Sequence, residues 1–491
     1  MVHRSLTMIS CLKGPKVLRA LLVLVLAFTA LYLREVPVAS AATITVTTTA
    51  DELNNDGDCS LREAIQAANT DTAVDACPAG NGDDIITLPA GTYTLTLAGA
   101  GEDGNTTGDL DITDNLTING AGAASTVIDG GKIDRILHIL GVSATINGVT
   151  ITNGYSSSGG GGIYNHAGTL TLNRSVVSSN NAGGTGGGGG IFNNQGTVTL
   201  NSTTVSDNTA DYGGGIYNYR YYTSIGVLTL NYSTVSGNWA SKGGGISNYI
   251  GTVTLNNSTI SSNTANVDGG GGIYTLYGTV TLNHADITFN DTDLGNGGGI
   301  NNAASTVTIE NTIIAGNYDA GGEAPDCSGT LTSQDYNLIQ DITGCSFTGT
   351  TTHDITGQAA LLITLADNGG PTFTHALQAT SPAIDQIPNG SNSCAAGSSI
   401  DQRGAVRADG AGRGGSGCDM GPYEFDSTIL PCPDFAYPVG VGLEDIQTVA
   451  GHWGEQSTDP GWNPQYDLDG NQLINILDIM KVAMAVSSIC P

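Results

Sequence analysis

A short pattern of apolar and polar residues recurs along the middle of the chain. In each copy, glycines precede an isoleucine, a run such as Thr197-Val-Thr-Leu-Asn201 follows, and a Val-Ser-x-Asn run ends the unit. Successive isoleucines lie roughly 25–30 residues apart, a period that is typical of solenoid proteins. These isoleucines are Ile163, Ile191, Ile216, Ile246, Ile273 and Ile300.

Alternation inside each run predicts short β-strands with one apolar face. In the run quoted above, Val198 and Leu200 point to one side and the threonines to the other. One unit cannot bury these residues alone, so the units must stack. The glycines can take positive φ and turn the chain sharply. The asparagines that end the runs can tolerate left-handed turns and form ladders between units. We therefore predict an all-β fold, a right-handed parallel β-helix, over residues 42–350.

The two ends of the array differ from the repeats. Ser60 and Glu63 form an S-x-x-E capping box, which predicts a helix through about Asn69. An amphipathic helix at this place would cover the open end of the solenoid core. After Pro431, glycine becomes scarce and helical periodicity appears, so residues 429–491 are predicted to form a separate α-helical module.

The N-terminal segment, 1–41, is predicted to be a secretory signal. Basic residues precede an uncharged apolar run at 20–33, and Ala39-Ser40-Ala41 provides a cleavage site. This run is shorter than the roughly 20 residues that a membrane span needs. We expect a secreted or cell-surface protein with no transmembrane segment in its mature chain; an uncleaved anchor is the alternative.

Charge and cysteine content narrow the class of protein. With 15 basic and 45 acidic residues the net charge is −30, which disfavours binding to nucleic acid and anionic lipid. The cysteines beyond the signal are even in number, as expected for an oxidising compartment. Proximity in the sequence suggests four disulfides: Cys59–Cys77, Cys327–Cys345, Cys394–Cys418 and Cys432–Cys490.

Three stretches resemble known families. The run Cys59-Ser-Leu-Arg-Glu-Ala64 resembles the namesake motif of the CSLREA domain, and the repeats resemble those of polymorphic outer-membrane proteins and pectate-lyase-like β-helices. Residues 365–425, with Ser381-Pro-Ala-Ile-Asp385 and Asp401-Gln-Arg-Gly404, resemble the choice-of-anchor Q domain. These resemblances imply a bacterial surface protein in which residues 42–350 include an N-terminal cap and residues 351–428 end the β-helix.

A candidate Ca²⁺ loop lies in the C-terminal module. Oxygen donors occupy positions 1, 3, 5, 7, 9 and 12 of a loop, and they are Asp467, Asp469, Asn471, the Leu473 carbonyl, Asn475 and Asp478. The loop resembles a dockerin segment, which implies Ca²⁺ as cofactor and a cohesin-like partner or another cell-surface component. The second dockerin-like copy lacks carboxylates at positions 3, 5 and 9, so we expect one working calcium site. An acidic turn without metal is the alternative.

Two groups of residues in the array are candidates for carbohydrate chemistry. The densest acidic group is Asp286, Asp291 and Asp293, but no basic partner occupies a matching position in neighbouring units, so a solvated loop is the alternative to a catalytic cluster. The longest unit carries four tyrosines that could stack on sugar rings, unless the insertion is simply a tolerated loop: Tyr217, Tyr219, Tyr221 and Tyr222.

The repeat array contains few clustered charges, whereas the C-terminal module contains a clear calcium loop motif. This contrast favours a secreted or surface scaffold or adhesin that presents the β-helix to glycans and is attached through the dockerin-like module. The alternative is a polysaccharide lyase or glycosidase on a pectate-lyase-like β-helix. Activity on a polysaccharide panel would distinguish the two hypotheses.

Overall fold

The computed structural model describes residues 41–184, 186–220, 224–394, 399–407 and 417–425, with 446, 449–454, 456 and 474. The predicted signal up to residue 40, Tyr221, Tyr222, Cys432, Cys490 and the six residues of the predicted calcium loop lie outside the described residues.

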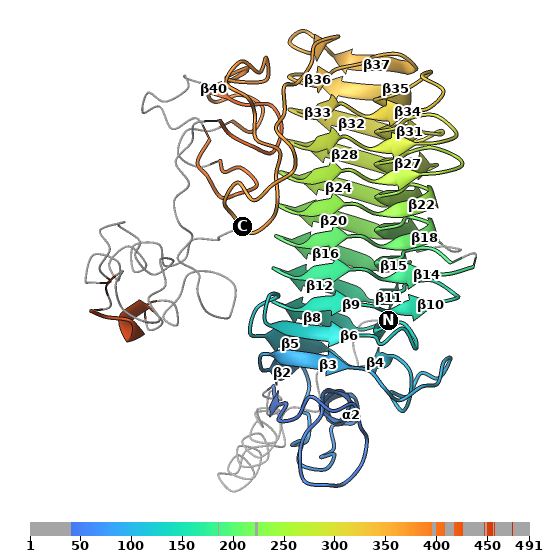
Figure 1. Cartoon of the computed structure of the whole chain (residues 1–491), viewed down its shortest axis with the longest axis vertical. Helices are drawn as coiled ribbons and strands as arrows, with labels where there is room; N and C mark the ends of the chain where they lie inside the picture. Colours follow the sequence, from blue (N-terminus) through green and yellow to red (C-terminus); the bar gives the residue numbers. More distant parts are fainter. Residues whose placement is uncertain are drawn as a thin grey trace, which may run out of the picture. The chain divides into compact units, whose positions relative to one another are not determined.

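The described chain winds into a stack of turns whose strands form parallel sheets (Figure 1). We name the sheets I to IV in the order in which one turn visits them. Sheet I contains β4 (Leu110–Ile112), β7 (Leu137–Leu140), β11 (Ile163–His166), β15 (Ile191–Asn194), β19 (Ile216–Tyr219), β23 (Ile246–Tyr249), β27 (Ile273–Leu276) and β31 (Ile300–Asn302). Sheet II contains β1 (Thr43–Thr45), β2 (Asp84–Leu88), β5 (Leu116–Gly120), β8 (Ser143–Asn147), β12 (Thr169–Asn173), β16 (Thr197–Asn201), β20 (Val227–Asn231), β24 (Thr252–Asn256), β28 (Thr279–Asn283), β32 (Thr306–Glu310), β35 (Cys327–Gln334) and β37 (Cys345–Thr350).

The other two sheets have shorter strands. Sheet III contains β3 (Gly91–Thr94), β6 (Thr126–Asp129), β9 (Thr150–Thr152), β13 (Val176–Ser178), β17 (Thr204–Ser206), β21 (Thr234–Ser236), β25 (Thr259–Ser261), β29 (Asp286–Thr288), β33 (Ile313–Ala315), β36 (Leu338–Ile339) and β38 (Ile355–Thr356). Sheet IV contains β10 (Tyr155–Ser156), β14 (Asn181–Ala182), β18 (Thr209–Tyr212), β22 (Trp239–Lys242), β26 (Thr264–Ala265), β30 (Asp291–Thr292) and β34 (Tyr318–Asp319).

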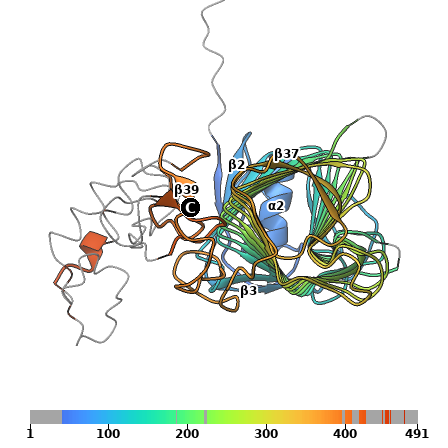
Figure 2. The same cartoon turned by 90° about the horizontal axis from the view of Figure 1, so that it is seen from above.

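Residues at the same place in the repeat pair in register from turn to turn. Eight successive turns each contribute one strand to sheets I, II and III, and β35 pairs with both β31 and β32. Within one turn Ile191, Val198, Leu200 and Val205 point inward and have no exposed surface. Seen along the stack, strands of successive turns overlie one another (Figure 2). The predicted all-β parallel β-helix is confirmed.

Asparagine ladders run through the stack, as predicted. The amide of each Val-Ser-x-Asn asparagine donates to the next, from Asn180 through Asn208, Asn238, Asn263 and Asn290 to Asn317, at 2.9–3.0 Å. The left-handed conformation does not fall on these asparagines. It falls on the residue before each of them, for example Ser262 with φ of 57°. These asparagines therefore form the predicted ladder, but the left-handed turn that we expected them to tolerate is made by the preceding residue.

The glycine triplets serve two purposes. The first glycine takes positive φ, as at Gly243 with φ of 62°. The second has an ordinary φ but no room for a side chain, because a Cβ on Gly244 would collide with the Thr264 carbonyl oxygen of the next turn. The first property was predicted from the sequence; the second follows from the close approach of stacked turns.

Helix α2 (Leu61–Thr70) begins at the predicted capping box. The Ser60 hydroxyl accepts the Glu63 N–H, and the Glu63 carboxylate accepts the Ser60 N–H. The apolar face of α2 packs against β2 and β4 at the N-terminal end of the stack (Figure 1). The helix therefore covers the end of the core, as its amphipathic pattern predicts.

The C-terminal segment is defined here as residues 358–394, 399–407 and 417–425. It packs against the outer face of sheet III and contains the antiparallel pair of β39 (Ile387–Pro388) and β40 (Gly417–Cys418). The Gln402 amide donates to Thr234 at 2.8 Å and accepts from Thr259 at 2.8 Å.

Three predicted disulfides are present: Cys59–Cys77, Cys327–Cys345 and Cys394–Cys418. Among the described residues, no helix has the length and apolar character that crossing a membrane requires.

Candidate functional site

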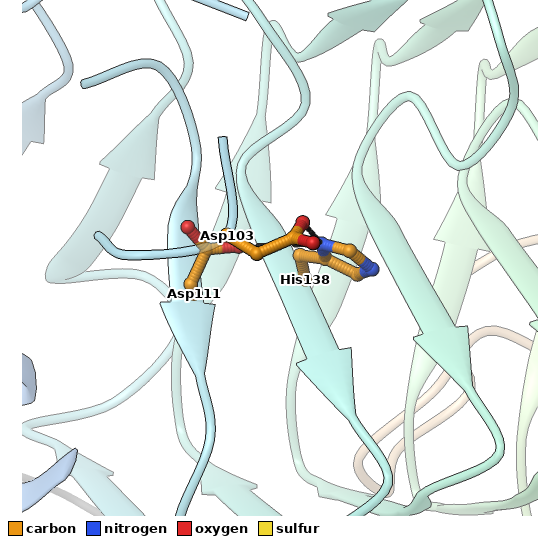
Figure 3. Close-up of side chains that lie close together, drawn as sticks. All are labelled: Asp103, Asp111 and His138. Carbon is orange, nitrogen blue, oxygen red and sulfur yellow. Dashed lines mark ion pairs between the residues drawn. The ribbon is translucent and has the colours of Figure 1, made fainter. Parts of the chain in front are cut away.

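A cluster of carboxylates and one histidine lies on the outer face of sheet I, in its first two turns. Asp111 on β4 and His138 on β7 are register partners, and Asp103 reaches them from the loop before β4 (Figure 3). The His138 Nδ1 atom lies 3.2 Å from Asp111 Oδ1 and 3.5 Å from Asp103 Oδ1. One ligand atom from each residue lies within 4.8 Å of the others, a spacing that can hold a metal ion.

Helix α2 and the loop that follows β3 position this cluster. The buried Arg62 guanidinium donates to the carbonyls of Gly108 and Asp109 at 2.8 and 3.0 Å, just before β4. The Asn69 amide donates to the Asp111 carbonyl at 2.7 Å. The Glu102 carboxylate accepts N–H groups of its own loop, which fixes the backbone beside Asp103.

Further charges surround the cluster. Asp109 lies beside Arg135, with Oδ2 3.4 Å from Nε. Burial, and then the nearby Asp111 carboxylate, raises the pKa of Asp109 to about 8, although Arg135 opposes the shift. Burial also raises the pKa of Asp134. The region is therefore rich in carboxyl groups, and the cations close to it among the described residues are Arg135 and the buried Arg62.

A row of aromatic rings continues from His138 along sheet I. His138 stacks on Tyr164 with centroids 5.0 Å apart, Tyr164 on Phe192 at 5.0 Å, and Phe192 on Tyr217 at 5.2 Å. Tyr219 stacks at 5.5 Å on the tyrosine one turn further on. Because these rings cover one another's faces, they offer their edges to solvent.

This row places two of the predicted sugar-binding tyrosines. Tyr217 and Tyr219 are both half-buried and packed within the row. Burial raises the pKa of Tyr217 above its ordinary value. The Tyr217 ring stacks on Phe192 and Tyr212, with centroids 5.2 and 5.6 Å away, which reduces the ring surface that a sugar could contact. Sugar binding by these tyrosines stays a prediction.

The three predicted catalytic aspartates do not share one sheet. Asp286 lies on β29 of sheet III, only 1% exposed, beneath the C-terminal segment, where a Cβ on Gly421 would lie 2.7 Å from Asp286 Oδ1. Asp291 lies on β30 of sheet IV and is half-buried. Asp293 comes directly after β30 and is exposed. A covered carboxylate such as Asp286 cannot contact a soluble substrate in this arrangement.

Sheet IV carries a second aromatic row, and its rings are open. Tyr155, Trp239 and Tyr318 are 43%, 40% and 59% exposed. They belong to one register column, in which the intervening positions are Asn181, Thr209, Thr264 and Asp291. Each ring is three turns from the next, which is about 14 Å at roughly 4.8 Å per turn.

A cavity of about 270 Å³ adjoins the first ring of this row. Its lining combines an aromatic ring, a cation, a carboxylate and several amides and hydroxyls: Lys132, Gly154, Tyr155, Ser179, Asn180, Asn181, Asp207 and Thr209. Such a mixture offers hydrogen-bond donors and acceptors beside an apolar surface.

Two sequence signals could have found these sites. Asp111 and His138 are separated in the sequence by one repeat length. Tyr155, Trp239 and Tyr318 follow one another at intervals of three repeat lengths. Asp103 carries no such signal, because it lies in an irregular loop.

The chain matches no known family model and no curated protein. Its fold is similar to that of the pectate lyase Pel9A, with a TM-score of 0.42 and 13% identity over 79% of this chain and 97% of the other. It is also similar to the A-module of the Azotobacter vinelandii mannuronan C-5 epimerase AlgE4, with a TM-score of 0.32 and 15% identity over 63% of this chain and 97% of the other.

Proposed function

We propose that the protein is a secreted or cell-surface scaffold that binds a neutral polysaccharide along sheet IV. The observation that carries this proposal is the row of Tyr155, Trp239 and Tyr318, whose rings are open to solvent and lie in one register column. Aromatic rings with a free face pack against the apolar face of a sugar, and neighbouring polar groups bind its hydroxyls.

The spacing and the charge define the ligand class. Rings about 14 Å apart are too distant for one sugar residue, so two of them can be contacted only by an extended chain. The net charge of −30 repels a polyanionic glycan unless cations intervene. A neutral polysaccharide therefore fits the row better than an acidic one.

Affinity electrophoresis on a panel of polysaccharides tests the proposal. We expect a neutral polysaccharide to retard the intact protein, and Trp239→Ala to weaken binding about tenfold, the loss of roughly 1.4 kcal/mol of ring packing. The matched control is Tyr277→Ala, because Tyr277 is 63% exposed and lies outside the row. Equal retardation of the wild-type protein and Trp239→Ala would contradict the proposal.

We propose that residues 429–491 attach the scaffold to a partner protein or to the cell surface. The dockerin-like spacing from Asp467 to Asp478 supports Ca²⁺ binding there, and a cohesin-like protein is the partner of that chemistry. The CSLREA-like and anchor-like motifs support a position at the cell surface. Calcium content of the chelated and reconstituted protein, compared with that of Asp467→Ala, tests the calcium part; unchanged stoichiometry would refute it.

Polysaccharide cleavage is the second candidate, and Asp109 favours it. A carboxyl group with a pKa of about 8 is protonated at neutral pH and can donate a proton to a glycosidic oxygen, with Asp111 two residues along as a second carboxyl group. The Asp109 side chain is only 5% exposed, however, which restricts access to a polymer. Product formation abolished by Asp109→Asn would establish cleavage; no turnover across the panel would leave the binding function.

A further inference from the structure

The Asp103–Asp111–His138 cluster contains a buried oxygen with no hydrogen bond. Asp111 has no exposed surface, and its Oδ2 accepts the Asn105 N–H at 2.9 Å. Its Oδ1 accepts no hydrogen bond from any described residue and points at His138 Nδ1, 3.2 Å away. A buried carboxylate oxygen left in this way is costly unless a cation or a proton occupies the space beside it.

We propose that Asp103, Asp111 and His138 bind a divalent transition metal of the zinc class, with one coordination position left for an oxygen ligand from solvent. Tetrahedral zinc binds nitrogen and carboxylate oxygen at roughly 2.0–2.2 Å, which separates neighbouring ligand atoms by about 3.3–3.5 Å. The two separations from His138 Nδ1, 3.2 and 3.5 Å, fit this geometry.

The donor set distinguishes this class of metal from calcium and magnesium. Ca²⁺ takes six to eight oxygen ligands at longer distances, and Mg²⁺ prefers oxygens in octahedral geometry. An imidazole nitrogen between two carboxylates suits zinc and its neighbours instead. The site is thus chemically different from the calcium loop predicted at the C-terminal end.

The ligands are held in place before any metal arrives. The Asn105 N–H orients the Asp111 carboxylate, and stacking on Tyr164, with an interplanar angle of 6°, orients the His138 ring. Asp103 closes the third side, and its side chain is 69% exposed. The open position therefore faces solvent, where water or a glycan hydroxyl can complete the coordination.

A proton is the competing occupant. A protonated His138 could pair with both carboxylates without a metal. The two cases differ in a measurable way, because only the metal site binds Zn²⁺ with a fixed stoichiometry and gives Co²⁺ a low-symmetry visible spectrum.

Equilibrium dialysis of the full chain tests the proposal. The chelated protein is titrated with Zn²⁺ in millimolar Ca²⁺, which saturates the predicted calcium loop, and separately with Co²⁺. We expect one Zn²⁺ equivalent that His138→Ala loses, and an affinity at least tenfold lower in Asp103→Asn, whose exposed position spares the fold. The Co²⁺ visible bands should disappear in His138→Ala and should require higher Co²⁺ concentrations in Asp103→Asn.

The control is His166→Ala, which removes an exposed histidine one turn away on the same sheet. It should keep the Zn²⁺ equivalent and the Co²⁺ bands. Equal Zn²⁺ binding by the wild-type protein and Asp103→Asn, or displacement of Zn²⁺ by millimolar Ca²⁺, would overturn the proposal. Because sheet IV is not involved, the outcome is independent of the polysaccharide proposal.

Discussion

Sheets III and IV are built from the same turns, yet the outer face of sheet III is covered from β21 to β33 whereas sheet IV is open. On sheet III, the hydroxyls of Thr234 and Thr259 pair with Gln402 of the C-terminal segment. On sheet IV, the column containing Trp239 faces solvent with its aromatic rings exposed. Parallel stacking repeats a side-chain position in every turn, and the residue types in that column decide what the face can bind.

The difference lies in size and hydrogen-bonding capacity. Small hydroxyl side chains leave a flat polar face on which a folded segment can lie closely, and hydroxyls such as those of Thr234 and Thr259 find partners in that segment. Protruding rings prevent such close packing but suit a ligand that fits between them. The two faces therefore respond differently to mutation.

The largest effect on stability is expected from a substitution in the interior asparagine ladder, because the turns that carry both sheets depend on it. Asn263→Ala removes the acceptor of two Asn238 N–H groups and the donors to Val235 and Asn290. Leaving several buried groups unpaired should lower the free energy of unfolding by about 4 kcal/mol. Chemical denaturation measures this change, and the outward Thr254→Ala should stay within about 0.5 kcal/mol. Similar losses in the two variants would contradict a structural role for the ladder.

A smaller, local effect is expected from separating the covering segment from sheet III. Gln402→Leu leaves the Thr234 and Thr259 hydroxyls without their side-chain partner, so the segment should loosen by about 2 kcal/mol. Hydrogen exchange should increase in residues 358–394 and not in sheet II. The exposed Gln386→Leu is the control, and uniform exchange across the chain would show that the segment and solenoid unfold together.

Contact between the segment and sheet III is also expected to depend on pH. Burial raises the pKa of Asp286 well above its ordinary value, and burial with the Glu424 carboxylate raises that of Asp419. Both groups therefore favour packing in their protonated forms, and this stability is lost as pH rises.

The buried His284 and His375 have lowered pKa values, so their opposite contribution is confined to pH values below about 6.5. Above pH 6.5, exchange in the segment, corrected for its intrinsic pH dependence, should increase toward pH 8.5. Asp286→Asn should reduce the increase. A pH-independent segment in the wild-type protein would contradict burial of these carboxyls.

The smallest effect on stability is expected on the open face. Tyr318 is 59% exposed, so Tyr318→Ser should change the free energy of unfolding by less than about 1 kcal/mol. The same variant should weaken polysaccharide binding if the row is used. A large loss of stability would show that the ring supports the fold instead of a ligand.

Structural features that follow from local spacing in the chain could be predicted from the sequence. Periodicity placed Ile191, Val198 and Leu200 in the core, and the capping box at Ser60 placed α2, because local spacing dictates both features. The three described disulfides followed from proximity. None of these predictions needed contacts between unrelated parts of the chain.

The covered face and the histidine cluster were missed for a physical reason. Gln402 contacts residues far earlier in the chain, and no period connects them. Arg62 and Asn69 hold the strand of Asp111 against the helix, and Asp103 reaches His138 from an irregular loop. Burial of Asp286 likewise depends on a segment that carries no repeat, so its acidic neighbours in the sequence were a misleading guide.

The directional amide ladder has a consequence for how such a chain can change length. Each asparagine donates to the following turn, and Asn317 ends the series by donating to the Asp326 carboxylate at 2.8 Å. Duplicating or deleting one whole unit would add or remove one rung and leave every other rung, and both ends, unchanged. The protein can therefore become longer or shorter during evolution by entire turns, whereas an insertion of a few residues is tolerated only in the loops between them.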